Sequence, residues 1–85
     1  MIDTKEELAQ ITEIHTWFDQ WNTKVWYITA FDAEGNQVGE SADYHLKSSA
    51  LAHARGLALE TKTVTGTAPT FKVFTRNGHG MGDAA

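Results

Sequence analysis

The residues from Val25 to Phe31 read Val-Trp-Tyr-Ile-Thr-Ala-Phe and include no glycine, proline or charged side chain. Aromatic and β-branched side chains of this kind favour a β-strand. Alternate residues of a strand point to opposite faces, and here both faces carry bulk: Tyr27 lies with Val25 and Phe31, while Trp26 lies with Ile28. We therefore expect a central strand that is covered on both sides, with a helix on at least one of them.

The length and composition limit the class of protein. At 85 residues the chain predicts one domain, placed at residues 1–78, with a flexible glycine-rich tail at residues 79–85. A hydrophobic content of 41% favours a folded domain, and the lack of cysteine excludes disulfides and thiolate metal sites. No apolar run approaches the roughly 20 residues that span a bilayer, and no signal-peptide pattern opens the chain. We expect a cytoplasmic protein.

The negative charge is concentrated at the start of the chain. Residues 1–22 hold five acidic side chains and one basic one, which gives −4, whereas residues 23–85 hold six of each and are neutral. The whole net charge of −4 therefore belongs to the first segment. A surface of this charge favours a partner that is rich in lysine or arginine.

That first segment predicts an amphipathic helix over residues 4–21. Thr4 and Glu7 have the spacing of a capping box, in which the hydroxyl and the carboxylate satisfy amides of the first turn. Trp17 falls at the edge of the apolar stripe. The stripe itself repeats every three or four residues and consists of Leu8, Ile11, Ile14, Phe18 and Trp21.

The remaining elements follow the strand in order. Residues 32–36 read as a hairpin turn, and residues 37–44 as an antiparallel edge strand with a bulge at Gly39. An alanine-rich helix is expected over residues 46–61, where Gly56 predicts a close backbone contact. A last strand over residues 70–76 should turn Lys72, Phe74 and Arg76 away from this helix and Phe71, Val73 and Thr75 toward it.

The predicted fold is α+β, with an N-terminal helix and a three-stranded antiparallel sheet that packs one helix, in the order αββαβ. Residues 25–78 resemble small ββαβ domains of unknown function from bacteria and phages. The resemblance rests on Trp26, Gly35, the run Ala50-Leu51-Ala52-His53-Ala54-Arg55, and Asn77-Gly78. It implies no catalytic residues, and the N-terminal helix departs from the family pattern.

The sequence predicts neither an enzyme nor a metal or cofactor site. No two of the four histidines have the one-turn spacing of a zinc-binding helix, so we expect them to be solvated or capping residues: His15, His45, His53 and His79. The glycine-rich run at residues 78–83 lacks the lysine and the following helix of a phosphate loop. There is no cysteine, and no serine lies in a nucleophile motif.

The favoured function is a small, non-enzymatic protein-binding module. Five aromatic residues lie within eleven positions, a density that suits either an interface or a core: Trp17, Phe18, Trp21, Trp26 and Tyr27. We expect Trp17, Trp21, Glu13 and Asp19 to contact a basic protein partner. In its short, acidic, cysteine-free form the chain is similar to inhibitors encoded by phages or mobile elements, including the anti-CRISPR group, which block host or defence machinery by occupying a surface.

Two other interpretations stay open. The last strand could bind nucleic acid, with Phe74, between Lys72 and Arg76, stacking on a base. Against this, the isoelectric point of 5.4 shows that the protein lacks the excess of basic residues that phosphate binding requires. The chain could also form a homodimer through its first helix or an edge strand.

Overall fold

The computed structural model describes residues 4–74, 79–80 and 83–84, with side chains for residues 4–74. The elements, in chain order, are α1 (Lys5–Gln10), β1 (Glu13–Phe18), β2 (Trp26–Phe31), β3 (Gln37–Tyr44), α2 (Lys47–Thr65), β4 (Thr70–Val73), β5 (His79–Gly80) and β6 (Asp83–Ala84). Four strands form one sheet in the order β3-β2-β1-β4. β1 is antiparallel to β2 and parallel to β4, and β2 is antiparallel to β3.

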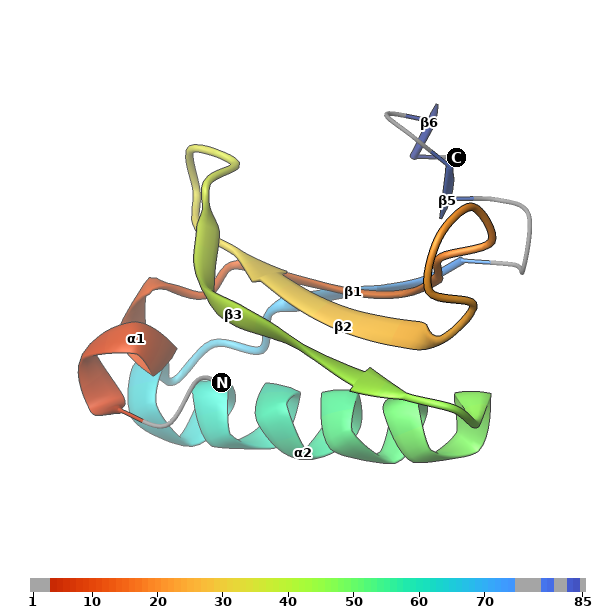
Figure 1. The fold of residues 1–85 in the computed structure, drawn as a ribbon. Coiled ribbons are helices and arrows are strands. Elements are labelled where there is room, and N and C mark those ends of the chain that lie inside the picture. The colour runs from red at the N-terminus through yellow and green to blue at the C-terminus, as the bar shows by residue number, and fades with distance from the viewer. Residues whose placement is uncertain (1–3, 75–78, 81–82, 85) are drawn as a thin grey trace.

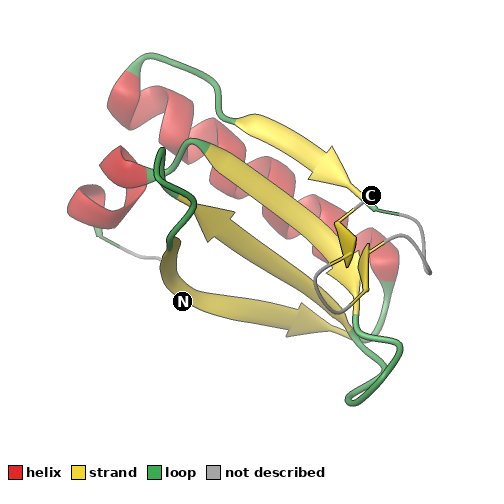
Figure 2. Cartoon of the chain, turned by 90° about the horizontal axis from the view of Figure 1, so that it is seen from above, coloured by secondary structure: helices red, strands yellow, loops and turns green. Residues whose placement is uncertain are grey.

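The molecule has two main layers. Figure 1 shows α2 running beneath the sheet, with α1 at one end, and the paired β5 and β6 on the side of the sheet away from α2. Figure 2 looks onto that opposite side, which no helix covers. We call it the outer face, and the side against α2 the inner face. The predicted mobility of residues 79–85 stays a prediction.

The predicted helix over residues 4–21 is wrong beyond its first turns. Its start is confirmed, because the Glu7 amide donates to the Thr4 hydroxyl at 3.1 Å. The helix ends at Ile11, whose backbone is extended, with φ −71° and ψ 123°. Residues 13–18 then form β1, so Trp17 lies on a strand and Trp21 lies in the following turn.

The α+β class is confirmed, but the three-stranded antiparallel sheet is wrong. The sheet has four strands and is mixed, because β1 inserts between β2 and β4 and runs parallel to β4. The interior position of the expected central strand is confirmed for β2, but a helix covers only its inner face, and the expected edge strand is confirmed as β3. The bulge on β3 is also present, since the register shifts there and Gly39 has a φ of 66°.

The core lies between the inner face and α2. Alternate residues of β1, β2 and β3 point inward, and the helix meets them with small side chains, among them Ala50 and Ala54, which have no exposed surface. These alanines let the helix approach the sheet closely. Leu8 and Ile11 extend the same buried cluster toward α1. The other main members are Ile14, Phe18, Trp26, Ile28, Ala30, Val38 and Leu57.

Thr16, at the centre of the inner face, tests this packing. It is completely buried, and its hydroxyl has no hydrogen-bond partner in the described part of the chain. Thr16→Val keeps the shape and removes an unsatisfied polar group, so we expect the free energy of unfolding to rise by about 1 kcal/mol. Urea unfolding would measure it. Thr29→Val is the control and should destabilise, because the buried Thr29 hydroxyl bonds both Trp17 and Ser41.

Candidate functional site

The outer face collects most of the side chains that the sequence singles out. Because directly paired residues of neighbouring strands share a face, β1 places Glu13, His15 and Trp17 on the same side as Tyr27 and Phe31 of β2. The same pairing brings Asp43 of β3 and Lys72 of β4 to this face. The structure therefore brings members of both predicted sets onto one surface: Glu13 and Trp17 of the protein-binding set and Lys72 of the nucleic-acid set.

Trp17 and Tyr27 form an aromatic pair at the centre of this face. Their rings stack with centroids 5.1 Å apart and planes at 27°. The indole N–H of Trp17 donates to the Thr29 hydroxyl at 3.0 Å, and that hydroxyl lies 2.7 Å from the hydroxyl of Ser41. Both rings stay partly exposed. The pair is therefore an aromatic surface that is fixed by the indole hydrogen bond and partly exposed to solvent, rather than a fully buried part of the core.

Trp21 lies in the turn between β1 and β2, and its side chain is 62% exposed. The turn is organised by Asp19, whose carboxylate accepts backbone N–H groups of Trp21 at 3.1 Å, Asn22 at 3.1 Å and Thr23 at 3.3 Å. The turn closes through Lys24, which has a φ of 57°, a conformation that non-glycine residues rarely adopt. Asp19 thus holds the turn that carries Trp21, while its predicted contact with a partner stays a prediction.

The Asp19 carboxylate gives a pH prediction. Its pKa is lowered, chiefly by the N–H of Asn22 and also by those of Thr23 and Trp21. Since the folded pKa lies below the unfolded one, this stabilisation is present above about pH 4 and is lost as the pH falls through the folded pKa. We expect Asp19→Asn to flatten the loss of stability on acidification, measured by urea unfolding between pH 7 and pH 2.5. Equal acid sensitivity in both proteins would contradict this role.

Glu13 and Lys72 neutralise each other across β1 and β4. The Lys72 ammonium lies 2.7 Å from a Glu13 oxygen, and the His15 ring lies 3.0 Å from the same oxygen. Lys72 and then His15 lower the pKa of the Glu13 carboxyl. The carboxylate that we expected to face a protein partner and the cation that we expected to face a phosphate are thus paired with one another.

Phe74 is only 6% exposed, and its ring centroid lies 5.1 Å from that of His15. A ring so enclosed offers little surface for stacking on a base. Arg76, the third residue of the nucleic-acid hypothesis, lies outside the described residues. The arrangement of Lys72 and Phe74 thus gives that hypothesis less support than the sequence did.

Two of the four histidines, His15 and His53, are held by neighbouring side chains. His53 Nδ1 lies 2.6 Å from the Tyr44 hydroxyl, and burial lowers the pKa of His53 against a smaller opposing effect of Glu60. His45 is exposed, and the side chain of His79 lies outside the described residues. Among the residues that the structure describes, no three acidic or histidine side chains cluster in a way that could hold a metal ion.

Sequence reasoning counted Tyr27 in the aromatic cluster without assigning it a contact, and it missed both the exposed Asp43 and the buried Thr29, which bonds the Trp17 indole. The available signal was the alternation in residues 13–18, where Glu13, His15 and Trp17 occupy every second position. With that segment interpreted as a strand, Trp17 would have been placed on a sheet surface next to a residue of the Val25–Phe31 strand.

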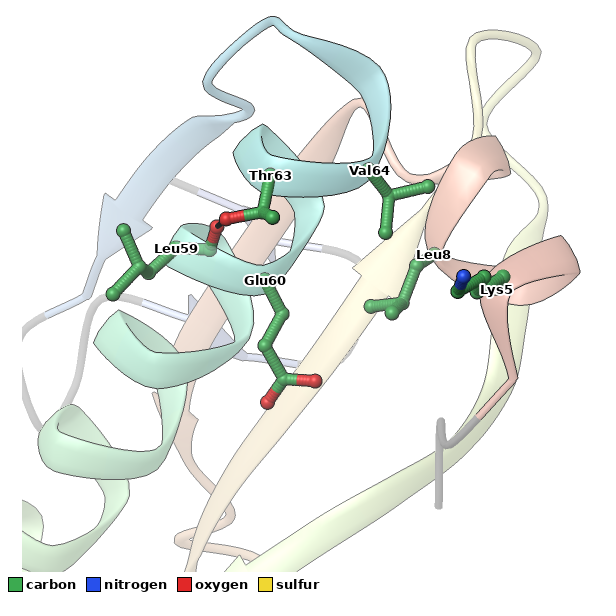
Figure 3. Close-up of a pocket in the computed structure, with 6 residues that line it drawn as sticks. All are labelled: Lys5, Leu8, Leu59, Glu60, Thr63 and Val64. Carbon is green, nitrogen blue, oxygen red and sulfur yellow. Dashed lines mark hydrogen bonds between the residues drawn. The ribbon is translucent and has the colours of Figure 1, made fainter.

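A second surface feature lies between the helices. A hollow of about 420 Å³ is lined by Lys5, Leu8, Leu59, Glu60, Thr63 and Val64. Figure 3 shows Leu8 and Val64 facing each other across it, while Leu59 leaves α2 on another side.

Of the helices that the structure describes, none is both long enough and apolar enough to cross a membrane. Comparisons with protein-family models, curated proteins and solved structures found no match to this chain.

Proposed function

We propose that this chain is a non-enzymatic protein-binding module whose contact surface consists of Trp21 and the stacked pair Trp17 and Tyr27. The observation that carries the proposal is the 62% exposure of Trp21 on a turn that Asp19 holds in place. An exposed tryptophan on an ordered turn presents a large apolar area at little entropic cost, which is the property of interface anchors.

The same surface favours a partner with lysine or arginine. Asp43 is exposed and pairs directly with Tyr27 across β2 and β3. Whereas Glu13 is compensated by Lys72, Asp43 forms no ion pair within the described residues and lies beside Tyr27 on the outer face. An arginine side chain can bind such a carboxylate and also stack on an indole. The net charge of −4 would add long-range attraction.

The proposed mode of action is occupation of a partner surface, because a rigid aromatic surface needs no chemistry of its own to block another protein. The likeness in composition to phage-encoded inhibitors stays a prediction.

Affinity capture with matched variants tests the proposal. The immobilised protein, Trp21→Ala and Leu46→Ala are compared in one lysate, where Leu46 serves as control because it is similarly exposed, at 65%, but lies at the start of α2. We expect a protein that binds the wild type and Leu46→Ala but not Trp21→Ala, and that still binds after nuclease treatment. Equal recovery by all three would contradict the proposed surface.

Salt dependence separates the nucleic-acid alternative from this proposal. Contacts with phosphates give an affinity that falls steeply with salt, by orders of magnitude between about 50 and 200 mM. If single-stranded or duplex oligonucleotides bind in this manner, and Lys72→Ala removes the binding, the outer face is a nucleic-acid surface instead.

A further inference from the structure

We propose that the chain forms a weak parallel homodimer through the solvent face of α2. This surface is on the far side of the molecule from the outer face of the sheet, so the inference stands independently of the proposed function. Figure 1 shows α2 as the lowest layer, with no other element beneath it.

The solvent face of α2 has the spacing of a helix seam. Buried residues of the helix are Ala50, Ala54, Leu57 and Thr61. The residues opposite to them at 100° per residue are Ala52, Gly56, Leu59 and Thr63, all exposed and separated by four, three and four positions. Such spacing corresponds to d, a, d and a positions of a heptad repeat, at which two parallel helices meet.

Leu59 is the apolar centre of this seam, with 67% of its surface exposed. Thr63, one turn later, donates its hydroxyl to the Leu59 carbonyl at 2.9 Å, which satisfies the hydroxyl inside the helix (Figure 3). Contact with apolar surface of a second copy would remove the Leu59 side chain from water, which favours association. Because Leu59 occupies a d position, a parallel dimer would place it against Leu59 of the second copy.

Gly56 supplies a second, independent observation. The sequence predicted a close backbone contact at this residue, but that prediction is wrong, because a Cβ built there meets no atom within 4 Å. Glycine inside a helix costs about 1 kcal/mol relative to alanine, and packing within the described chain does not require it. At an a position of the seam, the missing side chain would let two helices approach closely.

The charged residues beside the seam favour pairing with a second copy of the chain whose α2 runs parallel. Arg55 comes directly before Gly56 at the a position, so it is a g residue. Glu60 comes directly after Leu59 at the d position, so it is an e residue. Parallel dimers pair g with the e residue five positions further along the partner, which matches arginine with glutamate twice across a two-fold axis. Within the described chain neither side chain forms an ion pair of its own.

The antiparallel arrangement is disfavoured by the same residues. It pairs g positions with g positions, so Arg55 of one copy would approach Lys62 of the other. Since the seam contains one large apolar residue per chain, the buried area is small and the dimer must be weak.

Cysteine cross-linking tests the direction of pairing, because the chain contains no cysteine. Leu59→Cys places two thiols opposite each other only in the parallel dimer. Under oxidised glutathione we expect disulfide-linked dimer to form at least 10-fold faster from Leu59→Cys than from Leu46→Cys, a control of similar exposure outside the seam. Equal rates would overturn the parallel pairing.

Sedimentation equilibrium up to about 1 mM protein tests the association itself. We expect Leu59→Asp to raise the Kd at least 10-fold. Arg55→Glu should also weaken association, and the double variant Arg55→Glu with Glu60→Arg should restore it, because the pair is reversed rather than removed. A wild-type protein that is monomeric at 1 mM, or a dimer that Leu59→Asp leaves unchanged, would overturn the proposal.

Discussion

Replacing Ile14 with alanine is expected to lower the free energy of unfolding by about 2–5 kcal/mol. Ile14 has no exposed surface and lies on β1, an interior strand, between Ala30 of β2 and Phe71 of β4. Truncation leaves a cavity at the contact between the sheet and α2, and the neighbouring strands prevent its collapse. Because small domains are stable by only about 5–15 kcal/mol, this one change removes a large share of the total.

Urea unfolding followed by tryptophan fluorescence measures this loss. Ile14→Val is the matched variant and should cost only about 0.5–1.5 kcal/mol, since it removes one methylene. Leu46→Ala, which truncates an exposed side chain, should leave the stability within about 0.5 kcal/mol of the wild type. If Ile14→Ala were as mild as Leu46→Ala, the packing of β1 against α2 would be wrong.

The first segment shows why the sequence could not decide its own structure. Ile11, Ile14 and Phe18 fit the helical period, while Ile14, Thr16 and Phe18 fit the period of a strand. Both patterns place Ile14 and Phe18 in the core, so hydrophobicity alone does not choose between them. Pairing with β2 and β4 favours the strand, and although the alternation of residues 13–18 is a local sign of a strand, it does not reveal β4 as a partner more than fifty residues further along the chain.

Elements with a single consistent pattern were predictable. The strand predicted at Val25–Phe31 consists of aromatic and β-branched residues apart from Ala30, and the turn after it closes through Gly35, which has a φ of 84°. The helix rich in alanine formed as predicted, although α2 extends to Thr65 instead of ending near residue 61. Local chemistry determines these elements, because it agrees with their tertiary contacts.

The candidate site was predictable in its residues but not in their roles. Trp17 and Trp21 were found from aromatic density, which needs no structure. The pairing of Glu13 with Lys72 joins strands that the predicted fold did not place together. Asp19 was chosen for its charge, whereas its hydrogen bonds to the turn could be recognised only once residues 19–24 were known to be a turn.

If both proposals hold, the dimer has two contact surfaces on its outside. The seam on α2 and the outer face are on opposite sides of each copy, so pairing through α2 leaves both outer faces free (Figures 1 and 2). A partner with repeated sites would then be bound more tightly than by one copy alone.

Trp21→Ala is expected to weaken binding of the captured protein by at least about 30-fold, the change that corresponds to a loss of about 2 kcal/mol at a hot spot. The stability should stay within about 0.5 kcal/mol of the wild type, because most of the side chain faces solvent. Isothermal titration calorimetry gives the affinity, and Leu46→Ala is again the control. An unchanged affinity would remove Trp21 from the contact surface.

Asp19→Asn separates the contact from its positioning. The variant keeps the indole of Trp21 but weakens the hydrogen bonds that the charged carboxylate accepts from the turn. If the ordered turn contributes to affinity, this variant should bind more weakly than the wild type and more tightly than Trp21→Ala, with a more unfavourable binding entropy. The double variant should then bind no more weakly than Trp21→Ala, because a turn without its indole has nothing to position. Additive losses in the double variant would mean instead that Asp19 contacts the partner directly.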